Sequence, residues 1–144
     1  MRGTFVLVFA ASLAVPALAQ SSGSIRVQVT GAESADGRIG CALWNQGEGF
    51  PRETENARSQ QWTTLRGTSA TCVFRDVPSG RYAISIMHDA DGDGELDTNL
   101  FGVPREGWGV SKNLGIRRLR APRFSEAAFE FDGAVKEVRI RLRY

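Results

Sequence analysis

The sequence predicts an all-β fold, an antiparallel β-sandwich of about seven strands. Apolar residues alternate with polar ones in short runs, and turn signals separate these runs. No stretch has the 3.6-residue period of a strongly amphipathic helix. Short strands joined by regular turns are typical of two packed sheets. The chain of 144 residues shows no internal repeat or linker, so we expect one domain after any targeting segment.

The strands of the first half are predicted from alternation and from the turns between them. Ile25, Val27 and Val29 alternate with polar residues, and Asp36-Gly37 turns the chain into the next apolar run. The polar stretch that follows is expected to contain a short helix over residues 53–60. The expected strands are residues 25–29, 39–44, 62–65, 71–74 and 82–86.

The second half is predicted to hold a long loop and a closing hairpin. Residues 102–115 are rich in glycine and lack periodicity, which indicates an ordered loop. Phe129 and Phe131 are followed by alternating apolar residues from 138 to 144. This pattern predicts two paired strands that turn at Asp132-Gly133.

Residues 1–19 are predicted to be a signal peptide. Arg2 gives a positive start, residues 5–15 are almost entirely apolar, and residues 17–19 supply the small side chains that a signal peptidase reads. The apolar run is too short to span a membrane, and no second one follows. We therefore expect a mature domain of residues 20–144, periplasmic or secreted, with no transmembrane segment after removal of the signal.

The charge of the mature chain bears on its partners. Loss of Arg2 would leave 17 basic and 16 acidic side chains, a net charge of +1, so we expect no nucleic-acid partner. Envelope polysaccharide, anionic lipid or another envelope protein remain as candidates. A basic face could meet the first two, although a solvated, edge-protecting face is the commoner use of such a pattern. Its members would be Arg117, Arg118, Arg120, Arg123, Arg139, Arg141 and Arg143.

The two cysteines, Cys41 and Cys72, are predicted to form a disulfide. An exported chain meets an oxidising compartment, and each cysteine lies in an apolar, strand-like run. A bridge between neighbouring strands would place their Cα atoms within about 7 Å of each other. The alternative is a pair of buried free thiols.

The stretch "HDADGDGELDTN", residues 88–99, carries the clearest chemical signal. Carboxylates at alternate positions, with glycine at the sixth, match the first nine positions of a calcium loop. Leu96, at the eighth position, is expected to face inward. Oxygen ligands suit Ca²⁺, which would also relieve the repulsion between the carboxylates. The predicted ligands are the carboxylates of Asp89, Asp91, Asp93 and Asp97 and the carbonyl of Glu95.

This calcium loop is incomplete. Position twelve is Leu100 and not a bidentate glutamate, and a predicted strand, not a helix, precedes the loop. Asp97, Asn99, a carbonyl or a carboxylate from elsewhere would have to complete the coordination shell. The alternative is a solvated Asp-Gly turn that holds no ion.

Two further residues suggest other functions. His88, the single histidine, could be the base of a small envelope hydrolase, but no nucleophile or zinc partner can be assigned to it. A catalytic His88 must lie at the mouth of a pocket, so a buried one would exclude this reading. Trp108, between Gly107 and Gly109, could stack on sugars in a carbohydrate-binding module if it is exposed. Trp44 and Trp62 are expected in the core.

A family resemblance covers nearly the whole mature chain. Residues 77–113, "VPSGRYAISIMHDADGDGELDTNLFGVPREGWGVSKN", resemble the bacterial exported family called domain of unknown function 2141, and so does "FSEAAF", residues 124–129. The resemblance implies an immunoglobulin- or prealbumin-like sandwich of the transthyretin or carboxypeptidase-regulatory type. It implies no activity, because the family is uncharacterised. This chain carries Asp where the family often has Asn in the loop, which favours an ion.

We therefore expect an exported, non-enzymatic β-sandwich with a calcium-binding loop and a binding or structural role in the cell envelope. The contacts expected for a ligand, beyond the carboxylates, involve His88, Asn99 and Trp108.

Overall fold

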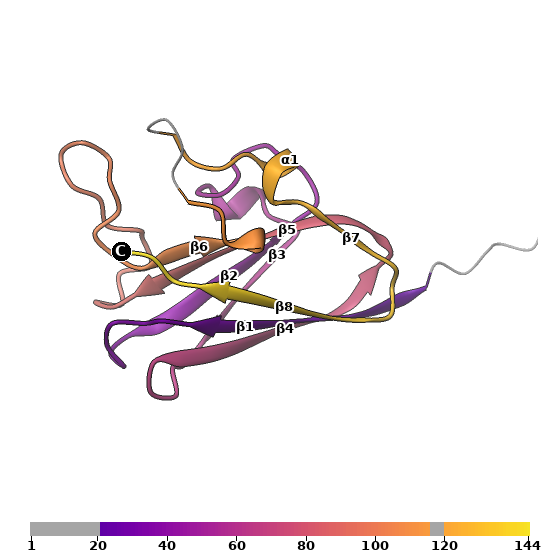
Figure 1. Cartoon of the computed structure of the whole chain (residues 1–144), viewed down its shortest axis with the longest axis horizontal. Coiled ribbons are helices and arrows are strands. Elements are labelled where there is room, and N and C mark those ends of the chain that lie inside the picture. The colour runs from indigo at the N-terminus through magenta and orange to yellow at the C-terminus, as the bar shows by residue number, and fades with distance from the viewer. Residues whose placement is uncertain (1–20, 116–119) are drawn as a thin grey trace, which may run out of the picture.

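The computed structural model describes residues 21–115 and 120–144, in which eight strands form two sheets that pack face to face (Figure 1). The predicted all-β sandwich is confirmed. The strands are β1 (Ser22–Thr30), β2 (Arg38–Trp44), β3 (Ser59–Thr63), β4 (Ser69–Pro78), β5 (Gly80–Asp89), β6 (Trp108–Val110), β7 (Phe129–Phe131) and β8 (Val135–Arg141). One short helix, α1 (Phe124–Ala127), precedes β7, and 3-10 turns occupy Thr54–Asn56 and Ser111–Asn113.

One sheet has the order β4-β1-β8, and the other has the order β3-β2-β5-β6, with β7 paired to the same strand β5. The pairs are antiparallel except that of β1 with β8, which is parallel. The expectation of a purely antiparallel sandwich is wrong at this pair. Beyond β8, Arg143 exchanges two backbone hydrogen bonds of 2.9 Å with Trp108, so the end of the chain joins the two sheets at one corner.

Three local expectations are corrected. The helix expected over residues 53–60 is a single 3-10 turn, and β3 begins at Ser59, three residues before the expected strand. The loop expected over residues 102–115 contains β6, a strand of three residues that forms through its partner β5. The predicted hairpin does not form, because β7 pairs with β5 while β8 pairs with β1 in the other sheet.

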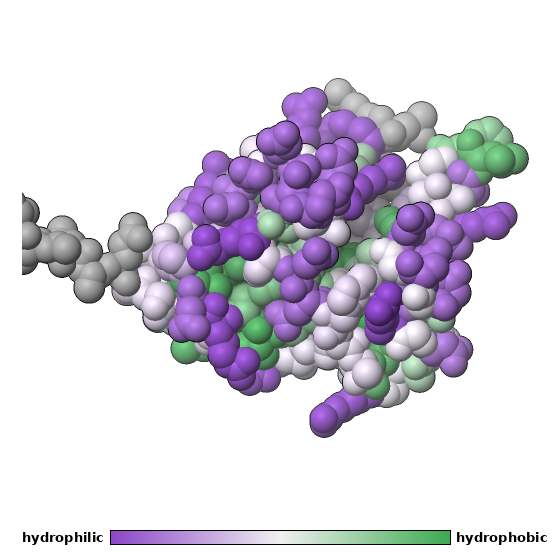
Figure 2. All heavy atoms as spheres, turned by 180° about the vertical axis from the view of Figure 1, so that it is seen from behind, coloured by the Kyte–Doolittle hydropathy of each residue, from purple (hydrophilic) through white to green (hydrophobic). Residues whose placement is uncertain are grey.

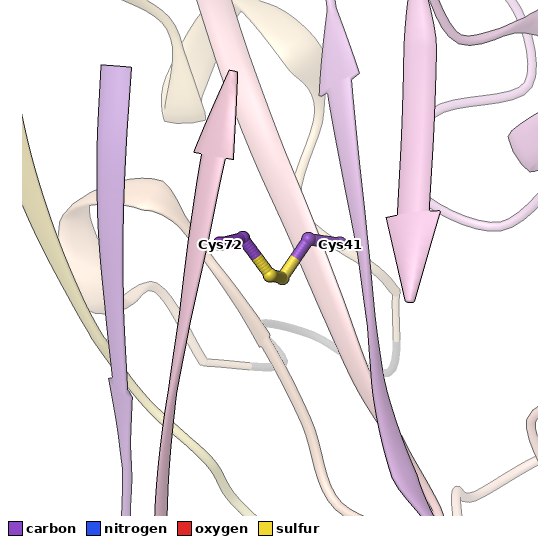
Figure 3. Close-up of a disulfide and its surroundings, with 2 residues drawn as sticks. All are labelled: Cys41 and Cys72. Carbon is purple, nitrogen blue, oxygen red and sulfur yellow. A yellow bond between two sulfur atoms is a disulfide. The ribbon is translucent and has the colours of Figure 1, made fainter. Parts of the chain in front are cut away.

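The main core lies between the sheets and follows the predicted alternation. Ile25, Val27 and Val29 of β1 are at most 1% exposed, and they face Ile39 and Leu43 of β2, which are fully buried. Cys41 and Cys72 are joined by a disulfide with a Cα–Cα distance of 6.6 Å, as predicted (Figure 3). The bridge does not link neighbouring strands, however. It connects β2 with β4 and so ties the two sheets together.

A second, smaller core covers part of the outer face of the five-stranded sheet. Trp44 is fully buried there, and its indole N–H donates to the Ser85 hydroxyl at 2.9 Å. Helix α1 packs over this face, and its Glu126 accepts hydrogen bonds from the Arg120 guanidinium and the Arg123 amide. These bonds lower the pKa of Glu126 to about 2. Packing and these hydrogen bonds therefore hold α1 and the residues just before it in place on the outer face of the sheet.

Some expectations fall outside the described residues. The signal peptide predicted for residues 1–19 lies there, as do Arg117 and Arg118 of the expected basic face. Within the described part of the chain, no helix is long and apolar enough to cross a membrane.

Candidate functional site

The acidic loop begins where β5 ends, and its first carboxylate is buried. The β2–β5 register places Asp89 opposite Arg38, and the Arg38 guanidinium donates from Nε to Asp89 Oδ2 at 2.7 Å. The amides of Gly92 and Gly94 also donate to this carboxylate, at 2.8 and 3.2 Å. Asp89 is 0% exposed, so these three bonds replace water around a buried negative charge. Arg38 was not identified from the sequence.

The environment of Asp89 favours its ionised form. Burial acts to raise the pKa of this carboxyl group. The hydrogen bond and charge of Arg38 and the two loop amides act in the opposite direction and prevail. The pKa of Asp89 therefore lies below the ordinary value for aspartate.

Glu106 supplies a second buried carboxylate to the same place. It is 8% exposed, and its two oxygens accept from the Ala90 amide at 2.8 Å and the Asp97 amide at 3.2 Å. Carboxylate oxygens of Asp89, Asp91 and Glu106 lie within 4.8 Å of one another. A search confined to the calcium-loop template misses Glu106, because it lies beyond the twelve positions of the loop. The only sequence signal for it is its place in the family-like "GVPREGWG" segment.

The other predicted ligands lie differently. Asp93, Glu95 and Asp97 are exposed and do not belong to this group of converging oxygens, so their part in binding an ion stays a prediction. Asn99 turns its side-chain oxygen to the amides of Phe101 and Val103, at 2.9 and 3.1 Å, and so shapes the tip of the loop. The inward orientation expected for Leu96 is confirmed, because it packs against the second core.

The converging carboxylates can accept a cation. Each ionised carboxylate offers about four lone-pair sites, and hydrogen bonds occupy two on Glu106 and one on Asp91. Asp89 has fewer free lone pairs, because its oxygens already accept hydrogen bonds from Arg38 and from two amides. Three hard oxygen donors with free lone pairs fit Ca²⁺, which accepts six to eight oxygens at loose angles. The remaining positions would belong to loop carbonyls or water.

His88 lies behind the acidic loop, inside the sandwich. It is 1% exposed, its Nε2 lies 2.8 Å from the Asp36 carbonyl, and its Nδ1 lies 2.7 Å from the Tyr144 hydroxyl. A carbonyl only accepts, so Nε2 carries the proton and Nδ1 accepts from the tyrosine. The Tyr144 hydroxyl in turn accepts from the Glu33 amide at 3.0 Å. Both ring nitrogens are thus hydrogen-bonded away from solvent, so His88 does not lie at the mouth of a pocket, where a hydrolase base would be expected.

Replacing Tyr144 by phenylalanine should lower the free energy of unfolding by about 1–2 kcal/mol, because a buried imidazole nitrogen loses its donor. Urea unfolding of Tyr144→Phe against the wild type measures the loss. Tyr82→Phe is a suitable comparison, since it removes a tyrosine hydroxyl that donates only to a local carbonyl, that of Pro78. Equal stability of Tyr144→Phe and the wild type would contradict the hydrogen-bond chain.

The glycines around Trp108 have a packing role. A Cβ at Gly107 would lie 2.6 Å from the Tyr144 ring, and one at Gly109 would lie 2.8 Å from Ile140. Both glycines therefore allow the C-terminal segment to approach β6 closely. Trp108 itself is only 9% exposed, so it is not the open platform that a carbohydrate-binding module requires.

Trp62 is the exposed tryptophan, at 41%, and its expected place in the core is wrong. Its position on the edge strand β3 leaves the indole at the surface, where the Arg38 guanidinium stacks 4.0 Å from the ring centroid. Arg38 therefore contacts both the acidic loop and Trp62.

Comparison with known proteins identifies a family but no characterised relative. A family model described as an uncharacterized protein conserved in bacteria (DUF2141) matches residues 27–139, which include the acidic loop, Glu106 and the Gly-Trp-Gly segment. No curated protein and no solved structure matches the chain. Because the match spans most of the chain, this protein belongs to the DUF2141 family of bacterial proteins.

Proposed function

We propose that this protein is an exported, non-enzymatic β-sandwich of the cell envelope whose acidic loop binds calcium. The observation that carries the calcium proposal is the charge of Glu106. This carboxylate is buried, and among residues 21–115 and 120–144 no cationic side chain forms an ion pair with it. Two backbone amides bind Glu106 but carry no net charge, and a divalent ion between Glu106, Asp91 and Asp89 would supply the missing countercharge.

The ion would stabilise the loop between β5 and β6. Asp89 ends β5 and Glu106 lies two residues before β6, so one ion would tie both ends of the intervening loop. Export is supported by the predicted signal peptide and by the disulfide, which persists in oxidising compartments. We expect a modest affinity, with Kd in the range of about 10⁻⁴–10⁻³ M that is known for extracellular calcium modules.

The proposal predicts a rise in thermal stability with calcium. At ten times Kd, calcium should add about 1.4 kcal/mol to the free energy of unfolding. For a domain of this size the gain corresponds to a rise in Tm of about 4–6 °C. Melting curves in millimolar calcium, in magnesium and in chelator measure it. Glu106→Gln and Asp91→Asn should each lose the response to calcium.

Asp76→Asn provides the matched control. Asp76 is exposed on β4, outside the loop, and its positive φ of 53° suits asparagine equally well. This variant should keep the full calcium response. Identical wild-type curves in calcium and chelator, or an undiminished response in Glu106→Gln, would leave only an acidic turn.

A further inference from the structure

The outer face of the five-stranded sheet carries an open groove of about 700 Å³, beside the acidic loop but not formed by its converging carboxylates. Strand register defines its floor. One row across β3, β2, β5 and β6 reads Trp62, Gly40, Met87 and Trp108, and the next row reads Gln60, Ala42, Ser85 and Val110. All eight residues line the groove.

The groove is deep because most of its floor residues on the central strands β2 and β5 have small side chains. Ala42 and Ser85 lie on the two central strands between Gln60 and Val110, and Gly40 lies beside Trp62 in the neighbouring row. A Cβ at Gly40 would come within 2.9 Å of the Trp62 ring and 3.2 Å of Met87. Glycine therefore lets both side chains lie close to the backbone of β2, and the space above them stays open.

Apolar side chains raise one wall of the groove. The loop between β5 and β6 contributes Leu96, Phe101, Val103 and Pro104. Its tip forms an apolar projection at the upper right of Figure 2, and Phe101 is 90% exposed. Trp62 and Val103, at 41% and 45%, also present apolar surface to solvent. Large apolar groups left exposed around one concavity are typical of a binding site.

The charges around the groove indicate the kind of ligand. Its lining contains two arginines and two glutamates: Arg52, Arg120, Glu55 and Glu95. Arg38, which stacks on the Trp62 ring, is paired with Asp89, so the groove offers no net charge to attract an ion. Arg120 is already held by Glu126 in a bidentate pair with distances of 2.8 and 2.9 Å. The groove therefore does not favour a charged ligand of either sign, whereas the Trp62 indole, Met87 and the apolar wall favour an apolar one.

We propose that this groove binds an uncharged, largely apolar small molecule that packs against Trp62. Its volume lies within the range of about 300–1,000 Å³ that is typical of small-molecule sites. The bound molecule would cover the part of the indole that Arg38 leaves exposed, and the apolar wall of the loop. This site is distinct from the proposed calcium site, and its ligand needs no metal.

Two dyes that share one apolar body provide the test. N-phenyl-1-naphthylamine is neutral, and its 8-sulfonate derivative is an anion of nearly the same shape. Titration of the folded chain in chelator, followed by dye fluorescence, should give saturable 1:1 binding of the neutral dye. The sulfonate should bind at least about tenfold more weakly, because a charge enters an apolar groove. The chelator keeps this outcome independent of calcium binding.

Variants locate the dye. Trp62→Ala removes the exposed indole, and Val103→Asp places a charge on the wall; each should weaken binding of the neutral dye by about tenfold or more. Both positions are well exposed, so folding should be retained. Val135→Ala is the control, because Val135 is an 80% exposed apolar residue at the start of β8, outside the groove. No saturable binding, equal affinity for both dyes, or wild-type affinity in both groove variants would overturn the proposal.

Discussion

Replacing Cys41 and Cys72 together by alanine is expected to lower the free energy of unfolding by about 3–4 kcal/mol. The disulfide closes a loop between cysteines 31 positions apart in sequence, and this constraint limits the freedom of the unfolded chain. The bridge also holds β2 against β4 across the main core, where both cysteines are at most 2% exposed. For a domain of this size we expect a fall in Tm of about 10–20 °C.

Urea unfolding followed by tryptophan fluorescence measures this loss. Wild-type protein unfolded with a reductant serves as the control, because it lacks the cross-link but keeps both side chains. It should match the alanine double variant within about 1 kcal/mol. A double variant as stable as the oxidised wild type would show that the bridge adds no stability.

Asp89→Ala is expected to cost about 2–4 kcal/mol even in chelator, where calcium has no part. The substitution leaves the Arg38 guanidinium and the amides of Gly92 and Gly94 without their acceptor. Hydrogen bonds to a charged group contribute about 1.5–3 kcal/mol each, and partial exposure of Arg38 reduces the total. Asp91→Ala is the matched comparison, since Asp91 is exposed and should change stability in chelator by less than about 0.5 kcal/mol.

The pH dependence separates the role of Asp89 from that of the other acids. Because its pKa is lowered on folding, its contribution to stability is fully present above the pKa of the unfolded chain, about 3.9. The contribution is lost as pH falls through the lower folded pKa. The stability of Asp89→Ala should therefore fall less steeply than that of the wild type below about pH 4. Parallel curves would contradict the lowered pKa.

The sequence predicts those strands that bury one face and expose the other, because their apolar and polar residues alternate. In β1, alternation of Ile25, Val27 and Val29 against polar residues is enough. Strand β6 could not be found in this way, because its three residues are all buried and its glycine is selected by contact with β8. The Asp132-Gly133 signal marks a real turn, but a local signal does not tell which sheet each flanking strand will join.

Of the candidate site, only the residues that are close together in sequence could be predicted. The spacing of Asp89 and Asp91 follows from a loop template, and the structure brings these two together. Glu106 and Arg38 reach the same place through strand pairing: Arg38 lies opposite Asp89 in the sheet, 51 positions away in sequence. Non-local contacts of this kind carry no sequence periodicity, so they become visible only once the strands are paired.

The parallel pairing of β1 with β8 has a consequence for how the chain reaches its folded state. The first strand of the domain has its two neighbours in β4 and in the last strand, so one edge of β1 stays open until the C-terminal residues arrive. Contacts between such distant segments raise the contact order, and high contact order slows folding. The final strand also positions the Tyr144 hydroxyl on His88. A chain that emerges from its N-terminus therefore acquires its complete sandwich only after β8 has emerged.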